Sequence, residues 1–442
     1  MGNLYRTIWR WHFYAGLFVI PFVVVLALSG SMFLFKPQIE RWEERAWQDL
    51  ATQDAVAPRR QVEAALATFP GASLHSYRLP QRAGDAAMIH LALPAGGAMR
   101  DVFVSPQGQV LGSVDPEARL IPVVRRIHGQ LLMGPRGSWL VELAASWTIV
   151  MVVTGLFLWW PRGRGAAGVL WPRRRSLLRD LHAVTGFWVA GLALVLLVTG
   201  LPWADVWGSA FQAVRQQVGW VNGPSDWSIG GRTAPELHAD HDHQAMQGHE
   251  AHGASLDLLD GLVATAARES LAPPVLVMAP GAAQFAGPPS RDWIVKSDSQ
   301  NRTLGMSIHF DAAGGTELSR EGFADQHPID RVVGYGISWH EGQLFGWINQ
   351  LIGLVTVMAL LAMSVTAFLM WRRRRPEGEL GAPPLPRDAR KPAVVAIAIL
   401  VLAAVLPLLA ASLVMLWLID RLLPRISPAA SRWLGLQPRK PA

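Results

Sequence analysis

Two apolar stretches of the chain follow one plan: WHFYAGLFVIPFVVVLALSG at 11–30 and HAVTGFWVAGLALVLLVTG at 182–200. Each contains a histidine followed four positions later by a glycine. Each closes on Ser-Gly or Thr-Gly, with the last glycine 18 positions after the histidine. About 20 apolar residues in a helix cross a bilayer core that is about 30 Å thick. Two matched stretches of this kind in one chain indicate the internal duplication of a membrane helix.

The duplication extends beyond these helices. The motifs HGQLLMG at 128–134 and HEGQLFG at 340–346 each stand directly before another apolar run. We therefore interpret 1–165 and 176–376 as two copies of one unit, and a further apolar run lies outside the repeat. The predicted transmembrane helices are 1–35, 139–160, 183–203, 344–371 and 393–419.

Composition and charge support this interpretation. Hydrophobic residues make up 51% of the 442 residues and charged residues only 17%, whereas a soluble protein has about a quarter charged. The formal net charge is +7, and the basic residues gather in the loops 161–182 and 372–392, which argues against nucleic-acid binding. The positive-inside rule places these loops and the N-terminus in the cytoplasm. The segments 36–138 and 204–343 and the tail 420–442 would then be periplasmic.

Both large outer segments have the pattern of small α+β domains. The first is predicted to contain a helix at 59–69 and strands at 86–93, 101–104 and 109–111. The second is predicted to contain a helix at 255–270 and strands at 275–278, 292–296 and 306–310. The predicted fold class is an α-helical membrane protein of five transmembrane helices, with duplicated two-span units, an extra C-terminal span and small α+β outer domains. Two separate domains and one joint cap are both compatible with the sequence.

The chain has no cysteine, which excludes disulfides, thiolate metal sites, iron–sulfur clusters and covalently attached haem. Histidines, however, recur at matched places in the repeat. His12 and His182 stand at the cytoplasmic start of outward-going helices, and His128 and His340 stand just before the outer start of inward-going helices. Histidines from two helices at one depth can supply both axial ligands of a b-type haem. A proton relay and a transition-metal path are the alternatives.

These matched depths predict two haems, one held by His12 with His182 and one by His128 with His340. Arginine pairs bidentately with carboxylates such as haem propionates. The candidates for that role are Arg10, Arg179, Arg125 and Arg126. Glu142 and Asn349, in the outer turns of their helices, are interpreted either as helix caps or as partners that orient His128 and His340.

A second candidate metal site is the histidine-rich loop 238–252. Imidazole together with carboxylate suits Zn, Cu, Ni or Fe, and short histidine-rich tracts are compositional signals of metal binding. A solvated loop with weak, adventitious affinity is the competing interpretation. The histidines of the loop are His238, His241, His243, His249 and His252.

Three groups of residues carry a resemblance to a known family: the N-terminal run beginning WRWHFYAGLF, the HGQLLMG and HEGQLFG motifs, and RDLHAVTGFW at 179–188. Over about 1–376 the chain resembles the PepSY-associated transmembrane helix family of iron-regulated inner-membrane proteins, which includes ferric-siderophore reductases. The resemblance implies a bacterial inner-membrane location, periplasmic PepSY-like domains and two b-type haems. It also implies electron flow from a cytoplasmic-side haem on His12 and His182 to a periplasmic-side haem on His128 and His340. The fifth span and the histidine-rich loop depart from the family pattern.

The sequence contains neither a dinucleotide fingerprint nor a Walker A motif, and the cytoplasmic loops are too short to form a flavin or nicotinamide domain. The expected electron donor is therefore a membrane quinol or a separate cytoplasmic reductase. The expected activity is reduction of a periplasmic ferric chelate such as a ferric siderophore, with release of Fe(II). Two alternatives belong to other classes: a non-enzymatic PepSY sensory or peptidase-regulating protein, and a metal transporter that uses histidine relays.

Overall fold

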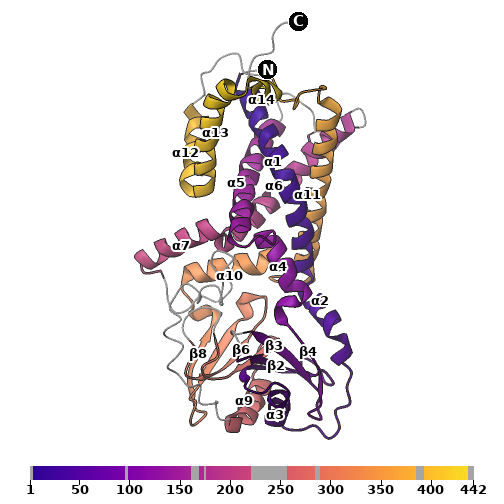
Figure 1. Ribbon diagram of the computed structural model, residues 1–442, viewed down its shortest axis with the longest axis vertical. Coiled ribbons are helices and arrows are strands. Elements are labelled where there is room, and N and C mark those ends of the chain that lie inside the picture. The colour runs from indigo at the N-terminus through magenta and orange to yellow at the C-terminus, as the bar shows by residue number, and fades with distance from the viewer. Residues whose placement is uncertain are drawn as a thin grey trace. The chain divides into compact units, whose positions relative to one another are not determined.

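The computed structural model describes residues 3–94, 98–160, 169–173, 176–220, 256–283, 289–384 and 393–436. The chain forms two compact units. One comprises Met1–Ser31, Ile127–Phe211 and Leu351–Ala442, and the other Met32–Arg126 and Gln212–Gln350. The first unit is helical and the second is built around a β-sheet (Figure 1). The histidine-rich loop 238–252 lies outside the described residues.

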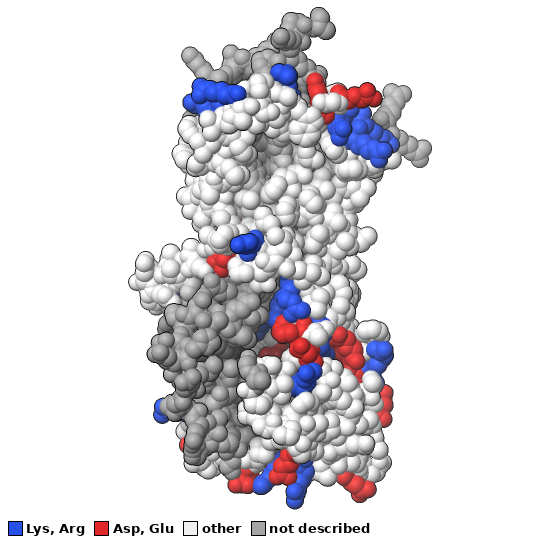
Figure 2. Space-filling model, in the orientation of Figure 1, with Lys and Arg blue, Asp and Glu red and all other residues white. Residues whose placement is uncertain are grey.

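Five helices are long and apolar enough to cross a membrane, as the sequence predicts. Along its middle the visible face of the helical unit is almost free of charged side chains, and basic side chains gather near the ends of α11 and α13 (Figure 2). This distribution matches a band of protein in contact with lipid. The five candidates are α1 (Asn3–Leu34), α5 (Pro135–Trp159), α6 with its 3-10 extension (Leu177–Trp203), α11 (Trp347–Arg374) and α13 (Pro407–Ile426).

The fifth apolar run differs from the prediction because it is split. The structure has α12 over Ala393–Val405 and α13 over Pro407–Ile426, in place of one helix over 393–419. Leu406 between them is extended, with φ −120° and ψ 90°. Proline lacks the amide hydrogen that would continue the helix and instead begins the next one. At about 1.5 Å per residue, α12 is about 20 Å long and too short to cross alone.

The described segments on either side of this split run lie at the N-terminal end of α1. Before α12, the Pro383 carbonyl accepts a hydrogen bond from Arg10. After α14 (Pro428–Trp433), the Leu434 carbonyl accepts one from the Tyr14 hydroxyl at 2.6 Å. Figure 1 shows α14 beside the start of α1. The described part of the tail, 420–436, therefore lies at the N-terminal end of α1, whereas the sequence prediction of a periplasmic tail over 420–442 places it on the opposite side from the N-terminus. We call Ala393–Trp433 the C-terminal hairpin.

In the second unit, both copies of the repeat contribute to one eight-stranded antiparallel sheet of order β4-β3-β2-β1-β5-β6-β7-β8. The two copies meet where β1 pairs with β5, with Tyr77 opposite Val277. The outer segments therefore form a joint domain, which settles the choice that the sequence leaves open. The strands are β1 (Ser73–Arg78), β2 (Ala87–Ala92), β3 (Met99–Val104), β4 (Val110–Val114), β5 (Val275–Met278), β6 (Trp293–Ser297), β7 (Met306–Phe310) and β8 (Glu317–Gly322).

One face of the sheet is covered by α3 (Pro58–Thr68) and α9 (Leu259–Arg268). The core between them contains Val62, Ile89, Leu259 and Trp293, none of which is exposed to solvent. The predicted helices and strands of this domain are confirmed within a few residues, whereas the sequence patterns did not indicate β1 and β8. Among the described residues the other helices are α2 (Lys36–Glu43), α4 (Leu120–Gln130), α7 (Asp205–Gln217) and α10 (Pro328–His340). Short 3-10 turns occur at Glu44–Trp47, Pro116–Ala118, Leu256–Leu258, Arg302–Leu304 and Phe323–Asp325.

Candidate histidine site in the membrane helices

His12 on α1 and His182 on α6 face each other in the helical unit. Their ring centroids are 6.3 Å apart and their planes cross at 78°. The two residues are 170 positions apart in the sequence, and each comes from a different copy of the repeat. The pairing that the sequence predicts from matched depth is therefore present in the structure.

Each of these rings is held by the following helix of its own copy. His12 Nδ1 lies 3.1 Å from the Met151 carbonyl oxygen and 3.1 Å from Thr154 Oγ1 on α5. His182 Nδ1 lies 3.2 Å from the Met363 carbonyl oxygen and 3.4 Å from Thr366 Oγ1 on α11. The duplication thus preserves the environment of each ring as well as the histidines.

These contacts determine which ring nitrogen carries the hydrogen. A carbonyl oxygen can only accept, so Nδ1 of His12 and of His182 must be the donor. In a neutral imidazole the other nitrogen, Nε2, then keeps its lone pair. Each ring is therefore anchored through one nitrogen and has the other available as a metal ligand.

Glycines allow these helices to approach closely. A Cβ added at Gly155 would lie 3.1 Å from His12 Cε1, and one added at Gly186 would lie 3.0 Å from Met363 Cε. The glycine four positions after His182 therefore serves helix packing in the second copy. A Cβ at Gly16 would be in ordinary contact with Met151 Sδ at 3.9 Å.

His128, near the end of α4, lies against the other end of α1. Its Nδ1 is 3.0 Å from Ser29 Oγ, and a Cβ on Gly30 would lie 3.0 Å from its Cε1. Burial lowers the pKa of His128 to about 4, so the ring is neutral at neutral pH. At 1.5 Å per residue, the 18 positions from His12 to Gly30 separate the two histidine levels by about 27 Å along α1. His340 is the last residue of α10 and belongs to the sheet-containing unit.

The arginine candidates for haem propionates already have protein partners. Arg10, only 7% exposed, donates to the Pro383 and Gly435 carbonyls and to the Tyr14 hydroxyl. Arg10 thus anchors the segments on either side of the C-terminal hairpin, and its predicted contact with a propionate stays a prediction. The other three candidates contact carboxylates: Arg179 contacts Asp180 at 3.3 Å, and Arg125 and Arg126 contact Glu117 at 3.3 and 2.6 Å.

Glu142 and Asn349 act as caps in the structure. Glu142, 2% exposed, accepts hydrogen bonds from the backbone amides of Val206 and Trp207 at the start of α7. Asn349 accepts from the amide of Leu344 and donates to the carbonyl of Trp339. These contacts agree with the first of the two interpretations made from the sequence, in which both residues cap helices or turns.

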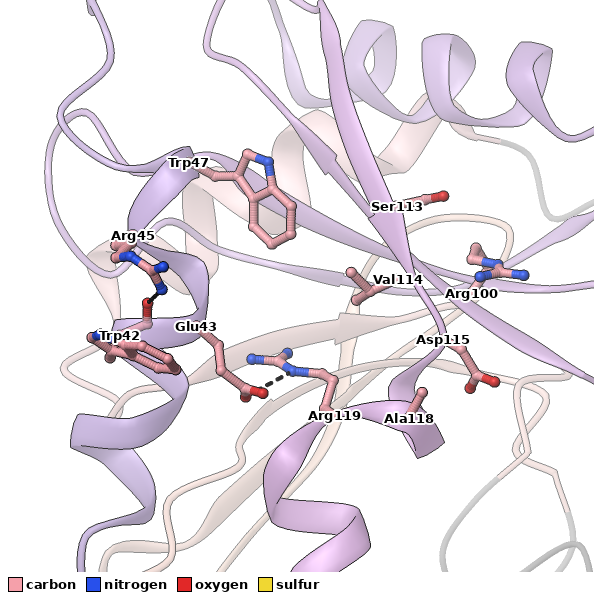
Figure 3. A pocket seen from close by; sticks show the side chains of 10 residues that line it. All are labelled: Trp42, Glu43, Arg45, Trp47, Arg100, Ser113, Val114, Asp115, Ala118 and Arg119. Carbon is pink, nitrogen blue, oxygen red and sulfur yellow. Dashed lines mark hydrogen bonds and ion pairs between the residues drawn. The ribbon is translucent and has the colours of Figure 1, made fainter.

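A pocket of about 490 Å³ lies in the sheet-containing unit, and its lining residues were not identified as a site from the sequence (Figure 3). Trp47 lines it and stacks on Phe103 at 3.7 Å between ring centroids. Arg119 points across it toward Glu43 and also contacts Glu44 at 2.8 Å. The guanidinium of Arg119 is therefore already paired with carboxylates. Its lining consists of Trp42, Glu43, Arg45, Trp47, Arg100, Ser113, Val114, Asp115, Ala118 and Arg119.

No group of three or more His, Asp or Glu side chains suited to a metal ion occurs in the ranges that the structure describes. The five histidines of 238–252 fall outside those ranges, so the predicted metal site in this loop stays a prediction. The paired histidines of α1 and α6 are a two-ligand arrangement, which suits a cofactor that brings its own equatorial ligands.

Comparison with known families agrees with the repeat. The family model described as the PepSY-associated TM region matches residues 9–374. No curated protein matches the chain. The match extends from the first transmembrane helix to the end of α11, contains all four repeated histidines, and stops before the C-terminal hairpin. The chain belongs to the PepSY-associated transmembrane family.

Proposed function

We propose that the protein binds haem b between α1 and α6 through His12 and His182 and conducts electrons across the inner membrane to a ferric chelate on the periplasmic side. The observation that carries the proposal is the 6.3 Å separation of the two ring centroids, with Nδ1 of each ring already hydrogen-bonded. This arrangement leaves two neutral nitrogens available from two helices.

The spacing fits an iron atom between the rings. Two metal–nitrogen bonds of about 2 Å, plus ~1.2 Å from each nitrogen to its ring centre, give about 6.4 Å. The absence of cysteine agrees with a haem held without covalent bonds. The helical environment supplies burial, and the haem, when bound, supplies reversible one-electron chemistry.

The sequence repeat extends the proposal to a second haem b, for which His128 and His340 are the candidate ligands. Two histidine levels about 27 Å apart along one helix would cover most of a bilayer core of about 30 Å. The donor on the cytoplasmic side would be a quinol or a separate reductase. The acceptor would be a ferric siderophore or a similar chelate, whose ligands hold Fe(II) less tightly than Fe(III).

The test is a reduced-minus-oxidised visible spectrum of the purified full-length protein. We expect a b-type signal, and we expect His12→Ala and His182→Ala to remove the same component of it. His309→Ala, on strand β7 of the sheet, is the matched control and should leave the spectrum unchanged. A wild-type protein without haem would overturn the proposal and favour the transporter or sensory alternatives. Removal of different components by the two variants would overturn the pairing.

A further inference from the structure

We propose that Thr154 and Thr366 are positioning residues for the two haem ligands, a role that the duplication has kept in both copies. Each threonine fixes the tautomer and direction of one histidine, Thr154 that of His12 and Thr366 that of His182. The inference rests on the proposed function for its redox consequence. Its structural part, that Nδ1 of each ring carries the hydrogen, can be tested without haem.

The hydroxyl of Thr154 has one hydrogen, which it donates to a carbonyl oxygen of its own helix. Thr154 Oγ1 lies 2.7 Å from the Val150 carbonyl oxygen and 3.0 Å from that of Met151. Since both of these groups only accept, the hydroxyl donates within α5. The oxygen of Thr154 is then an acceptor toward His12 Nδ1, at 3.1 Å.

The second copy repeats this arrangement on α11. Thr366 Oγ1 lies 2.8 Å from the Ala362 carbonyl oxygen and 3.0 Å from that of Met363, so its hydroxyl also donates within its own helix. His182 Nδ1 therefore donates toward Thr366 Oγ1 at 3.4 Å and the Met363 carbonyl at 3.2 Å. The motif is Met-x-x-Thr on the helix that follows the histidine, at 151–154 and at 363–366.

The two copies differ in how closely they hold the ring. Both acceptors of His12 are at 3.1 Å, whereas those of His182 are at 3.2 and 3.4 Å. After Thr154 stands Gly155, where a Cβ would come within 3.1 Å of His12 Cε1; after Thr366 stands Ala367. The glycine lets His12 approach α5 more closely, so we expect the Thr154 contact to have the larger effect.

A hydrogen bond from Nδ1–H to a fixed acceptor orients a ligating imidazole and makes it more basic. A more basic ligand stabilises Fe(III) relative to Fe(II). Loss of the hydroxyl should therefore shift the midpoint potential of the haem on this pair upward. The carbonyl of Met151 or Met363 remains as a second acceptor, so the haem itself should be retained.

The experiment compares Thr154→Val and Thr366→Val in the full chain, with potentiometric titration and low-spin haem EPR as readouts. Thr148→Val is the matched control in α5, because Thr148 makes the same intrahelical bond, to the Ala144 carbonyl at 2.6 Å. Thr356→Val serves likewise in α11, since Thr356 donates to the Ile352 carbonyl at 2.8 Å. Thr154→Ser, which keeps the hydroxyl, should restore the wild-type potential.

We expect an upward shift of potential and altered EPR g-values in both test variants, larger for Thr154→Val, and neither change in the controls. Loss of haem from Thr154→Val alone, with retention in Thr154→Ser and Thr148→Val, would also support the positioning role. Shifts no larger than those of the controls would overturn it.

A haem-free measurement separates this inference from the proposed function. Nitrogen-15 NMR of histidine-labelled protein, prepared without haem and assigned with His12→Ala and His182→Ala, should find hydrogen on Nδ1 of both rings. Hydrogen on Nε2 would overturn the inference even if haem binds. Conversely, a wild-type protein that never takes up haem, yet has both rings protonated at Nδ1, would overturn the proposed function and leave the assigned contacts standing.

Discussion

Replacing Arg10 with methionine should release the C-terminal hairpin from α1. The Arg10 guanidinium is 7% exposed and donates to the carbonyls of Pro383 and Gly435 and to the Tyr14 hydroxyl. These partners come from the two chain segments that flank the hairpin and from α1 itself. Methionine keeps the length of the apolar stem but leaves the two carbonyls and the hydroxyl without their donor.

The magnitude follows from those three contacts. A hydrogen bond from a charged donor contributes about 1.5–3 kcal/mol, and three would give more than 4. The substitution also removes the desolvation cost of a buried guanidinium, which offsets part of the loss. We therefore expect local opening of the hairpin ends to become easier by about 2 kcal/mol, which is a factor of about 30 in the opening equilibrium.

Hydrogen–deuterium exchange with mass spectrometry reports this opening directly. The backbone amide of Leu380 donates to the Trp433 carbonyl at 3.0 Å, and that of Leu436 donates to the Ser431 carbonyl at 2.9 Å. Peptides that contain these amides should exchange about 30-fold faster in Arg10→Met. Arg421→Met is the control, because Arg421 is exposed on the same hairpin and contacts only the Trp417 ring among its described partners. Unchanged exchange at both amides would refute the assignment of Arg10 as the anchor.

Three further predictions concern other parts of the chain. Reporter fusions at the N- and C-termini should indicate the same side of the membrane, and opposite sides would contradict the returning hairpin. Glu142→Leu removes the acceptor for the amides at the start of α7 and should lower the free energy of unfolding in detergent by about 1 kcal/mol. Glu142→Gln keeps a side-chain oxygen and should lower it by less. Chemical denaturation of both variants measures the difference. Burial, and then the neighbouring His90, lowers the pKa of His75 to about 4, so the unfolded chain binds a proton between pH 6.5 and 4 that the folded chain resists. The free energy of unfolding should therefore decrease as the pH is lowered through this window, by about 2–3 kcal/mol at pH 4.5 from this residue alone. Between pH 7 and 4.5, His75→Asn should lose less of its thermal midpoint than the wild type. Equal losses in the two proteins would contradict the assignment.

The membrane helices and the first histidine pair were predictable because membrane segments leave a strong signal. Twenty apolar residues have few alternatives in a bilayer, and the repeat of histidine and glycine at equal spacing relates His12 to His182 without a structure. The threonines that hold these rings were not predictable. Thr154 and Thr366 stand in apolar helices where a threonine hydroxyl ordinarily bonds to its own backbone, and nothing in their spacing indicates a histidine on another helix.

The C-terminal hairpin was missed for a related reason. Hydropathy averages over a run and does not register that Pro407 can begin a helix as readily as it can bend one. The contacts that fix the direction of the chain there are long-range. The Tyr14 hydroxyl bonds to the Leu434 carbonyl, 420 positions away, and local periodicity carries no information about such a pair. Likewise, the joining of β1 to β5 depends on strand-edge pairing between copies, for which short alternating patterns give no partner.

The proposed haem site gives a reason why this unit occurs twice in one chain. Each copy supplies one histidine and the threonine that contacts it. Under the proposed function, a single copy would therefore have only half of a two-ligand site. Two copies complete it across a pseudo-symmetric contact, as identical subunits complete a site at a two-fold axis. The sheet is also completed by the two copies together, since each copy contributes four strands and the two halves pair through β1 and β5. Covalent linkage lets the two halves diverge, and His12 is held more closely than His182. If both rings bind one haem as proposed, its two ligands would be chemically unequal, which two identical subunits cannot provide.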